Sequence, residues 1–390
     1  MKHRHPNPIP VTGTLAYCLL AFVAMAGLAY INFLPGVVNA LAGDIGFSDA
    51  QAGQIVALNG YGGLLGSAIA VALIRRVRWQ YAMLTFLALL SIVDLATAWV
   101  EHYPLLLGWR FGAGLLGGLC VGIGLAALAR LNDPDRAFGL LMFVQFSLGS
   151  VVIYLLPGLE TVLGPHAVFH VMAALAALSL IFLPFLPTLR LDRSPVEPSA
   201  PLPANTALLL LAILGYQLAA SGIWAYVGLI GRDAGMAAEP VSQYIAATGL
   251  LGLLGAMLPV INGKRLGRLF WVSTGLVMSM LAAVLLNYAQ HTVLYVAAMA
   301  LLFFAWPAVQ SFLLAVTADM DRSGRLSAMA GLTAYVGLAS GPLLAASLLD
   351  HDGFPAMLYS CAGLFFTSFL LLLRPVQARD SPVGAVSFSR

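Results

Sequence analysis

The sequence has very little charge for its length. Asp, Glu, Lys and Arg make up 9% of the 390 residues, and hydrophobic residues make up 61%. A soluble domain uses those four charged types for roughly 25% of its chain, because they cover its surface in water. The shortage of charge therefore excludes an ordinary soluble globular protein and makes lipid the solvent for most of this chain.

Signatures of several other protein classes are also missing. Cysteine occurs three times, far apart in hydrophobic runs, which argues against a disulfide framework or a cysteine metal site. The chain has no Gly-x4-Gly-Lys-Ser/Thr loop, so ATP-driven transport is disfavoured. A membrane-embedded enzyme would need His, Asp, Ser or Cys clustered near one interface, and no such cluster occurs. We therefore expect no enzymatic activity, no cofactor and no metal.

The hydrophobic residues are gathered into twelve runs. Each run is long enough to cross a bilayer as a helix, the open-chain structure that satisfies its own backbone in hydrocarbon. The sequence therefore predicts an all-α integral membrane protein whose direct surroundings are lipid. The twelve predicted helices cover residues 15–38, 51–74, 81–100, 105–129, 137–156, 167–186, 207–230, 241–261, 269–286, 293–316, 326–349 and 355–373.

Lys and Arg are distributed very unevenly between the two sides of the membrane. If the N-terminus is cytoplasmic, seventeen of the nineteen fall in cytoplasmic segments, whereas Arg232 lies in an outer segment and Arg110 within a span. Basic residues are enriched on the cytoplasmic side of membrane proteins. We therefore predict an even number of spans with both termini in the cytoplasm. The absence of an Asn-x-Ser/Thr sequence further favours a bacterial inner membrane.

The second half of the chain echoes the first. Residues 54–66 align with residues 243–255, and the basic pairs at 75–76 and 264–265 coincide at the same offset of 189 residues. An offset of about six helices predicts parallel repeats related by an axis along the membrane normal. The predicted parts are a six-helix bundle over residues 1–186, a cytoplasmic linker over 187–205, a second bundle over 206–374 and a cytoplasmic tail over 375–390.

Two loops carry a related motif at matching places in the halves. Residues 66–78 (Gly-Ser-Ala-Ile-Ala-Val-Ala-Leu-Ile-Arg-Arg-Val-Arg) and 262–268 (Asn-Gly-Lys-Arg-Leu-Gly-Arg) are similar to Gly-x3-Asp-(Arg/Lys)-x-Gly-(Arg/Lys)-(Arg/Lys), with Ala70 in place of the aspartate. Residues 110–114 (Arg-Phe-Gly-Ala-Gly) and 337–342 (Gly-Leu-Ala-Ser-Gly-Pro) add two further patterns. On these residues the whole chain resembles the major facilitator superfamily.

The resemblance implies two six-helix bundles around a central cavity and transport by alternating access. The cavity is formed in that fold by the first, second, fifth, seventh, tenth and eleventh helices. Uncharged polar and aromatic residues at the middle of these helices suit a small organic solute. For each of them, an ordinary hydrogen bond between helices is the alternative role. The candidate cavity residues are Asn32, Asn59, Gln145, Gln217, Trp224, Trp306, Gln310 and Tyr335.

The basic loops are predicted to gate the pathway rather than to bind substrate. Their side chains meet helix C-termini and acidic residues when the cytoplasmic side closes. The candidate gating residues are Arg75, Arg76, Arg78, Lys264, Arg265 and Arg268.

One acidic and one basic residue lie well inside predicted spans. Asp94 lies eight residues before the turn expected near His102, and Arg110 lies eight residues after it. At about 1.5 Å per residue, both reach the same depth in adjacent antiparallel helices. Because an isolated charge in a membrane is costly, we predict an ion pair. Asp94 then takes up and releases the coupling proton, or the pair is a permanent lock between two helices.

These observations predict a proton-coupled secondary transporter for a small organic solute, working as a monomer without a nucleic-acid partner. The scarcity of charge on the cavity helices favours export by antiport. However, residues 145–152 lack the Gly-x3-Gly-Pro element that drug exporters of the resembled family carry. The nearest alternative is an uptake carrier for an organic anion anchored by Arg110. A membrane-embedded enzyme is a more remote one, and composition does not exclude a channel or receptor.

Overall fold

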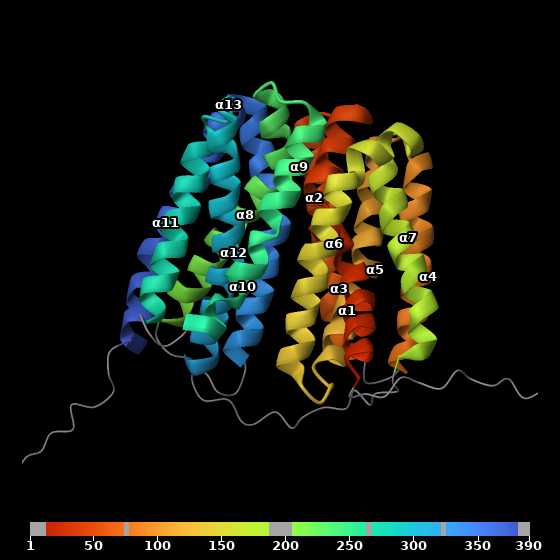
Figure 1. Ribbon diagram of the computed structural model, residues 1–390, viewed down its shortest axis with the longest axis horizontal. Coiled ribbons are helices and arrows are strands. Elements are labelled where there is room, and N and C mark those ends of the chain that lie inside the picture. Colours follow the sequence, from red (N-terminus) through yellow and green to blue (C-terminus); the bar gives the residue numbers. More distant parts are fainter. Residues whose placement is uncertain (1–12, 74–77, 187–204, 263–266, 321–324, 381–390) are drawn as a thin grey trace, which may run out of the picture.

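The computed structural model is a bundle of long helices (Figure 1). It describes residues 13–73, 78–186, 205–262, 267–320 and 325–380, and these residues contain no strand. Twelve helical segments in them are long and apolar enough to cross a membrane, which confirms the predicted all-α membrane fold. The helices are α1 (Thr14–Asn32), α2 (Leu34–Asn39), α3 (Asp49–Leu73), α4 (Trp79–Ala96), α5 (Tyr103–Leu128), α6 (Pro134–Leu163), α7 (Ala167–Phe182), α8 (Thr206–Asp233), α9 (Ala238–Gly249), α10 (Leu251–Asn262), α11 (Arg268–Leu286), α12 (Thr292–Met320) and α13 (Arg325–Asp380), with short helical turns η1 (Ala40–Asp44), η2 (Thr97–Trp99) and η3 (Leu183–Phe185).

Polar side chains fix where two of the spans begin. The Ser48 hydroxyl accepts from the backbone N–H of Gln51 at 3.2 Å, and the side-chain Oε1 of Gln51 accepts from the backbone N–H of Ser48 at 3.1 Å. This reciprocal capping box starts α3. The Asp133 carboxylate accepts from the N–H of Arg136 at 3.0 Å and starts α6. Both caps satisfy backbone donors that have no partner inside the helix.

Proline and glycine interrupt the helices at two places. The sequence predicts one helix over residues 15–38, but α1 ends before Phe33 and α2 begins after it. Pro35 has no N–H to donate to the carbonyl of Ile31 four residues earlier, so the helix is interrupted there. At the other end of the chain, α13 contains two spans that turn at Gly353, whose φ is 72°.

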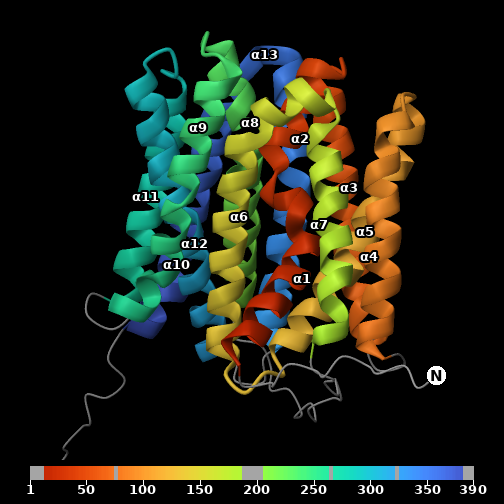
Figure 2. The same ribbon diagram turned by 45° about the vertical axis from the view of Figure 1, so that its right-hand side comes forward.

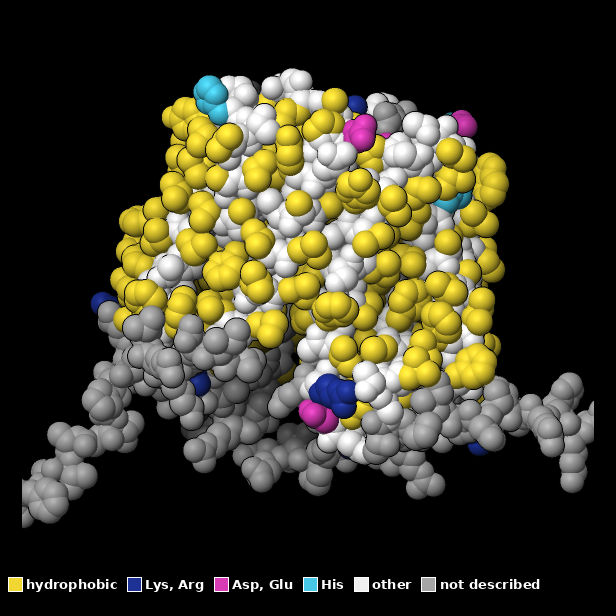
Figure 3. Space-filling view, viewed as in Figure 1, with side chains coloured by type: hydrophobic (Ala, Val, Ile, Leu, Met, Phe, Trp, Pro, Cys, Tyr) yellow, Lys and Arg dark blue, Asp and Glu magenta, His cyan; other side chains and the backbone are white. Residues whose placement is uncertain are grey.

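On the face that Figure 3 shows, the exposed charged side chains lie at the two ends of the bundle and the surface between them is mostly hydrophobic. We call the end where α4, α6 and α11 begin, with Arg78, Arg136 and Arg268, the basic end. The opposite end, which carries Glu101 and Glu239, is called the acidic end. The exposed hydrophobic side chains between the two ends form the belt that lipid requires.

The helices form two groups that lie side by side (Figures 1 and 2). One group holds α1 to α7 and the other holds α8 to α13. The internal repeat is visible in their packing. A Cβ added to Gly66 would overlap the backbone carbonyl of Leu115, and one added to Gly255 would overlap that of Phe304. The two pairs are separated by the same 189 residues as the sequence repeat, so each group contains an equivalent close helix contact.

Candidate functional site: a central cavity and a buried ion pair

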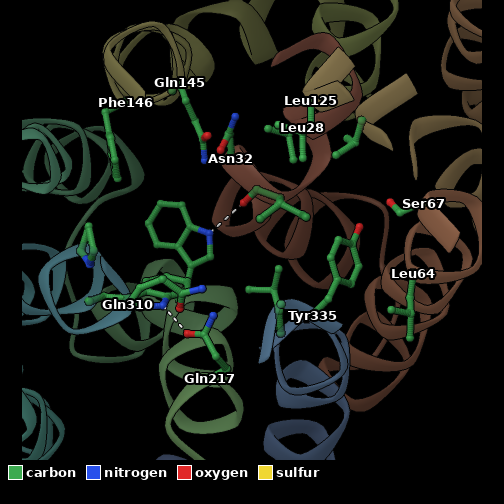
Figure 4. Close-up of a pocket in the computed structure, with 18 of the residues that line it drawn as sticks. Leu28, Asn32, Leu64, Ser67, Leu125, Gln145, Phe146, Gln217, Gln310 and Tyr335 are labelled. Atoms are coloured by element: carbon green, nitrogen blue, oxygen red, sulfur yellow. Dashed lines mark hydrogen bonds between the residues drawn. The ribbon is translucent and has the colours of Figure 1, made fainter. Parts of the chain in front are cut away.

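A cavity of about 830 Å³ lies between the two groups of helices (Figure 4). The first group lines it with α1, α3, α5 and α6, and the second with α8, α9, α12 and α13. Its volume is within the roughly 300–1,000 Å³ of pockets that hold small organic molecules. Because both groups contribute walls, any movement of one group against the other changes the shape of the cavity.

The two groups close on each other toward the acidic end. The Tyr226 hydroxyl of α8 donates to the backbone carbonyl of Asp49, at the start of α3, over 2.7 Å. Farther into α3, a Cβ added to Gly53 would overlap that of Ala346 and would lie 2.9 Å from the backbone oxygen of Pro342, both on α13. The backbones of α3 and α13 therefore touch, and solute has no path between them here.

Toward the basic end, the same two helices separate. The lining residues of α3 extend to Val71, within one turn of its end, and those of α13 extend to Ala328, in its first turn. On α5 they extend to Leu125, also close to the basic end. The cavity therefore opens toward the basic end and is closed toward the acidic end.

Seven of the eight predicted cavity residues line this space. Asn32 and Gln145 come from the first group of helices, on α1 and α6, and Gln217 and Gln310 from the second, on α8 and α12. Figure 4 shows these four carboxamide side chains around the cavity, with Tyr335 on a further wall. The other two are Trp224 and Trp306.

The break in the first span explains how Trp224 is held. The carbonyl of Ile31 lacks its helical donor because Pro35 has no N–H. Nε1 of Trp224 donates to this carbonyl over 2.9 Å, from the other group of helices. The Trp224 ring also packs edge-to-face on Phe303, with centroids 5.1 Å apart. The indole is therefore fixed between the two groups, beside the cavity.

The predicted ion pair forms between α4 and α5. Arg110 Nη1 lies 2.7 Å from Asp94 Oδ1, and the two residues are 1% and 3% exposed. The guanidinium also donates to Thr97 Oγ1 at 3.2 Å and to Asn59 Oδ1 at 2.9 Å. The side chain of Asn59 thus brings α3 into the same network.

Aromatic rings enclose the guanidinium. Its central carbon lies 4.7 Å from the ring centre of Tyr30 and 5.1 Å from that of Phe169. Cation–π contacts of this kind strengthen when water is excluded. Neither ring was predictable as a partner of Arg110, because both lie in helices that are hydrophobic on every side.

The structure corrects the predicted place of Asn59, which does not line the cavity. Asn59 points from α3 to Arg110 on α5, and the next residue, Gly60, faces Ala339 of α13 across the closed region. Arg110 also lies outside the cavity, because α5 lines it only from Val121 onward, nearer the basic end. The predicted alternative in which Arg110 anchors an anionic solute therefore lacks the required geometry.

The lining residues that were not predicted from the sequence include two aromatic ones, Phe146 and Phe303. Each lies close to a predicted residue: Phe146 directly follows Gln145, and Phe303 lies one helical turn before Trp306 on α12. The chain has 20 phenylalanines, most of them in spans, so nothing marks these two out.

Of the predicted gating residues, two lie in the described part of the chain. Arg78 is exposed at the start of α4, and Arg268 begins α11. The remaining predicted gating residues lie outside the described residues, as does the predicted linker except for residue 205. They are Arg75, Arg76, Lys264 and Arg265.

Comparison with known proteins places this geometry in a family. The family model described as Major Facilitator Superfamily matches residues 17–320. No curated protein sequence matches the chain. Two similar solved structures are those of the nucleoside transporter NupG (TM-score 0.72, 14% identity, 96% of this chain and 100% of that one) and of a D-xylose-proton symporter (0.69, 17%, 91% and 97%). A NupG variant is similar at TM-score 0.75 and 13% identity, over 93% of this chain and 98% of that one. At these identities the structures share the fold, and the family match shows that the chain belongs to the major facilitator superfamily.

Proposed function

We propose that the chain is a secondary active transporter that moves a small uncharged organic solute by alternating access. One observation carries the proposal: the cavity lies between two equivalent helix groups, open toward the basic end and closed toward the acidic end. Rocking of the two groups about the cavity would close its opening at the basic end and create an opening at the acidic end. A channel would need no such one-sided closure.

We also propose that the basic end faces the cytoplasm, as the distribution of Lys and Arg favours. The described state is then open to the inside, and both termini lie in the cytoplasm of a bacterial inner membrane. Since one chain encloses its whole cavity, a monomer suffices for transport. Export in exchange for protons stays a prediction, and counterflow of solute in vesicles of both orientations tests it.

The close contact at Gly53 provides the test of alternating access. Gly53→Val places a branched side chain where α3 meets Ala346 and Pro342 of α13, so closure at the acidic end should fail. Spin labels on η1 and on the first turn of α9 should then move apart, as pulsed EPR distances measure. In Gly139→Val no atom lies within 4 Å of the added Cβ, so its distances should match those of the wild type. Unchanged distances in Gly53→Val would contradict the proposal.

We further propose that Asp94 carries the coupling proton. Arg110 holds Asp94 and Asn59 at once, and the residue after Asn59 meets Ala339 of the other helix group. Protonation of Asp94 weakens its hold on Arg110. A shift of Arg110 then moves Asn59 and with it α3. The movement of α3 in turn alters its contact with Ala339, which helps to close the acidic end. The pair itself does not line the cavity, so it acts on the conformation and not on the solute.

The coupling proposal predicts that the conformational equilibrium depends on pH through Asp94. In the wild type, the acidic-end spin-label distances should shift between pH 5.5 and pH 8, because protonation changes the Arg110 network. In Asp94→Asn they should no longer respond to pH. Asp133→Asn, which changes an exposed carboxylate at the basic end, should respond as the wild type does. If the spin-label distances of the wild type do not change with pH, the ion pair is a permanent lock between α4 and α5 and the coupling proposal is wrong.

A further inference from the structure

Resting on the proposed function, we infer that the cavity takes a neutral, flat heteroaromatic solute with a lactam-like edge, meaning a ring carbonyl beside a ring N–H. The first reason is charge. None of the side chains that line the cavity in the described part of the chain carries a charge. The buried charges nearest to it, Asp94 and Arg110, pair with each other, and Arg110 also donates to Asn59 and Thr97. An ionic solute would lose its water in the cavity without meeting a counter-charge.

The second reason is the state of the two tryptophans. Nε1 of Trp224 is bound to the carbonyl of Ile31 at 2.9 Å, and Nε1 of Trp306 to Oε1 of Gln217 at 2.5 Å. Neither indole has its N–H left for a solute. A solute can therefore contact only the ring surfaces of the two tryptophans. Phe146 adds a third aromatic ring to the cavity wall. Rings held in this way favour the stacked or edge-to-face contacts of another flat ring.

The third reason is the set of polar groups that have no partner. Nδ2 of Asn32 is buried without a hydrogen bond, and Asn32 is 8% exposed. The carboxamides of Gln145, on the same side, and of Gln310, on the opposite side, also line the cavity without a side-chain hydrogen bond in the described residues. A primary amide presents a donor and an acceptor side by side. Its complement is an edge with one acceptor and one donor, as a lactam has.

These groups also argue against the two other neutral classes. A sugar has a hydroxyl on nearly every ring carbon, whereas most of the wall here is aliphatic or aromatic. Several of its hydroxyls would be buried without partners, which a binding site penalises strongly. A purely hydrophobic solute would leave Nδ2 of Asn32 unpaired. A flat ring with one polar edge meets both requirements.

The test uses four probes and the thermal midpoint of the purified full-length protein in detergent. The probes are 2-quinolone, N-methyl-2-quinolone, quinoline-2-carboxylate and glucose. A ligand of the folded state raises the midpoint as its concentration exceeds its dissociation constant. We expect 2-quinolone to bind at least 10-fold more tightly than each of the others, because methylation removes the donor, the carboxylate adds charge and glucose lacks a flat ring. Equal binding of the N-methyl compound, preference for glucose or the carboxylate, or no binding would overturn the inference.

Variants locate the binding. Asn32→Leu and Gln310→Leu should each weaken 2-quinolone at least 10-fold, whereas Gln243→Leu, at the acidic end on α9, should leave it unchanged. The Gln310 side chain has no hydrogen-bond partner among the described residues, so its variant keeps the test valid if Asn32→Leu fails to fold. The Gly53→Val distance measurement involves no solute. If the acidic end opens in that variant while no lactam binds, the solute class is wrong and alternating access stands.

Discussion

Replacing Arg110 with methionine is expected to lower the free energy of unfolding by about 3–5 kcal/mol, because it leaves the buried carboxylate of Asp94 without its cation. Arg110 is 1% exposed and Asp94 3%, so water does not reach either group to compensate. The same change removes the partner of Asn59 and the cation between the rings of Tyr30 and Phe169. Three helices lose their shared contact at one point.

Arg136→Met is the matched control. Arg136 also donates to a side chain, Thr14 Oγ1 at 2.7 Å, and also lies over an aromatic ring, that of Tyr17 at 5.4 Å. It is exposed at the basic end, however, so its loss should cost about 1 kcal/mol or less. Unfolding titrations in mixed micelles measure both variants.

A double variant separates the buried charge from lost packing. Asp94→Leu with Arg110→Met removes both charges, and hydrophobic replacement of a buried ion pair is often neutral or stabilising. We expect the double variant to recover most of the stability that Arg110→Met loses. If it is no more stable than Arg110→Met, the stranded carboxylate is not the cause of the loss.

The depth of this ion pair was predictable because helix lengths alone determine it. Asp94 and Arg110 lie equally far from a turn, and the structure places that turn between Trp99, at the end of η2, and Tyr103, at the start of α5. Because the rise per residue is the same in both helices, equal distances along the chain give equal depths in the membrane. Twelve spans were predictable for a similar reason, since each must match the thickness of the bilayer.

The direction in which each helix faces was not predictable in the same way. A soluble helix shows its buried side as a hydrophobic stripe, but a helix such as α3 is hydrophobic all round, so periodicity marks no face. The sequence therefore placed Asn59 in the cavity with the other mid-span polar residues. Asn59 contacts Arg110 instead because Gly114 on α5 has no side chain. Its absence lets α3 approach closely enough for Asn59 to reach Arg110.

That close approach leads to the second large effect, in Gly114→Ala. The added methyl group would overlap the backbone carbonyl of Asn59. A flexible side chain can turn away from such an overlap, but a backbone carbonyl cannot, so α3 and α5 must move apart. Overpacking of this kind typically costs about 1–3 kcal/mol and sometimes more. The separation should also lengthen the hydrogen bond between Arg110 and Asn59, and with it weaken the proposed link from Asp94 to the other helix group.

Gly112→Ala, two residues earlier on α5, should have the opposite effect. No atom lies within 4 Å of the Cβ that it adds. Alanine is favoured over glycine inside a helix by roughly 0.5–1 kcal/mol, so this variant should be slightly more stable than the wild type. The two thermal midpoints should therefore move in opposite directions for the same substitution on the same helix. If both rise, α3 and α5 are not in backbone contact at Asn59, and the path from the ion pair to the closed end must run elsewhere.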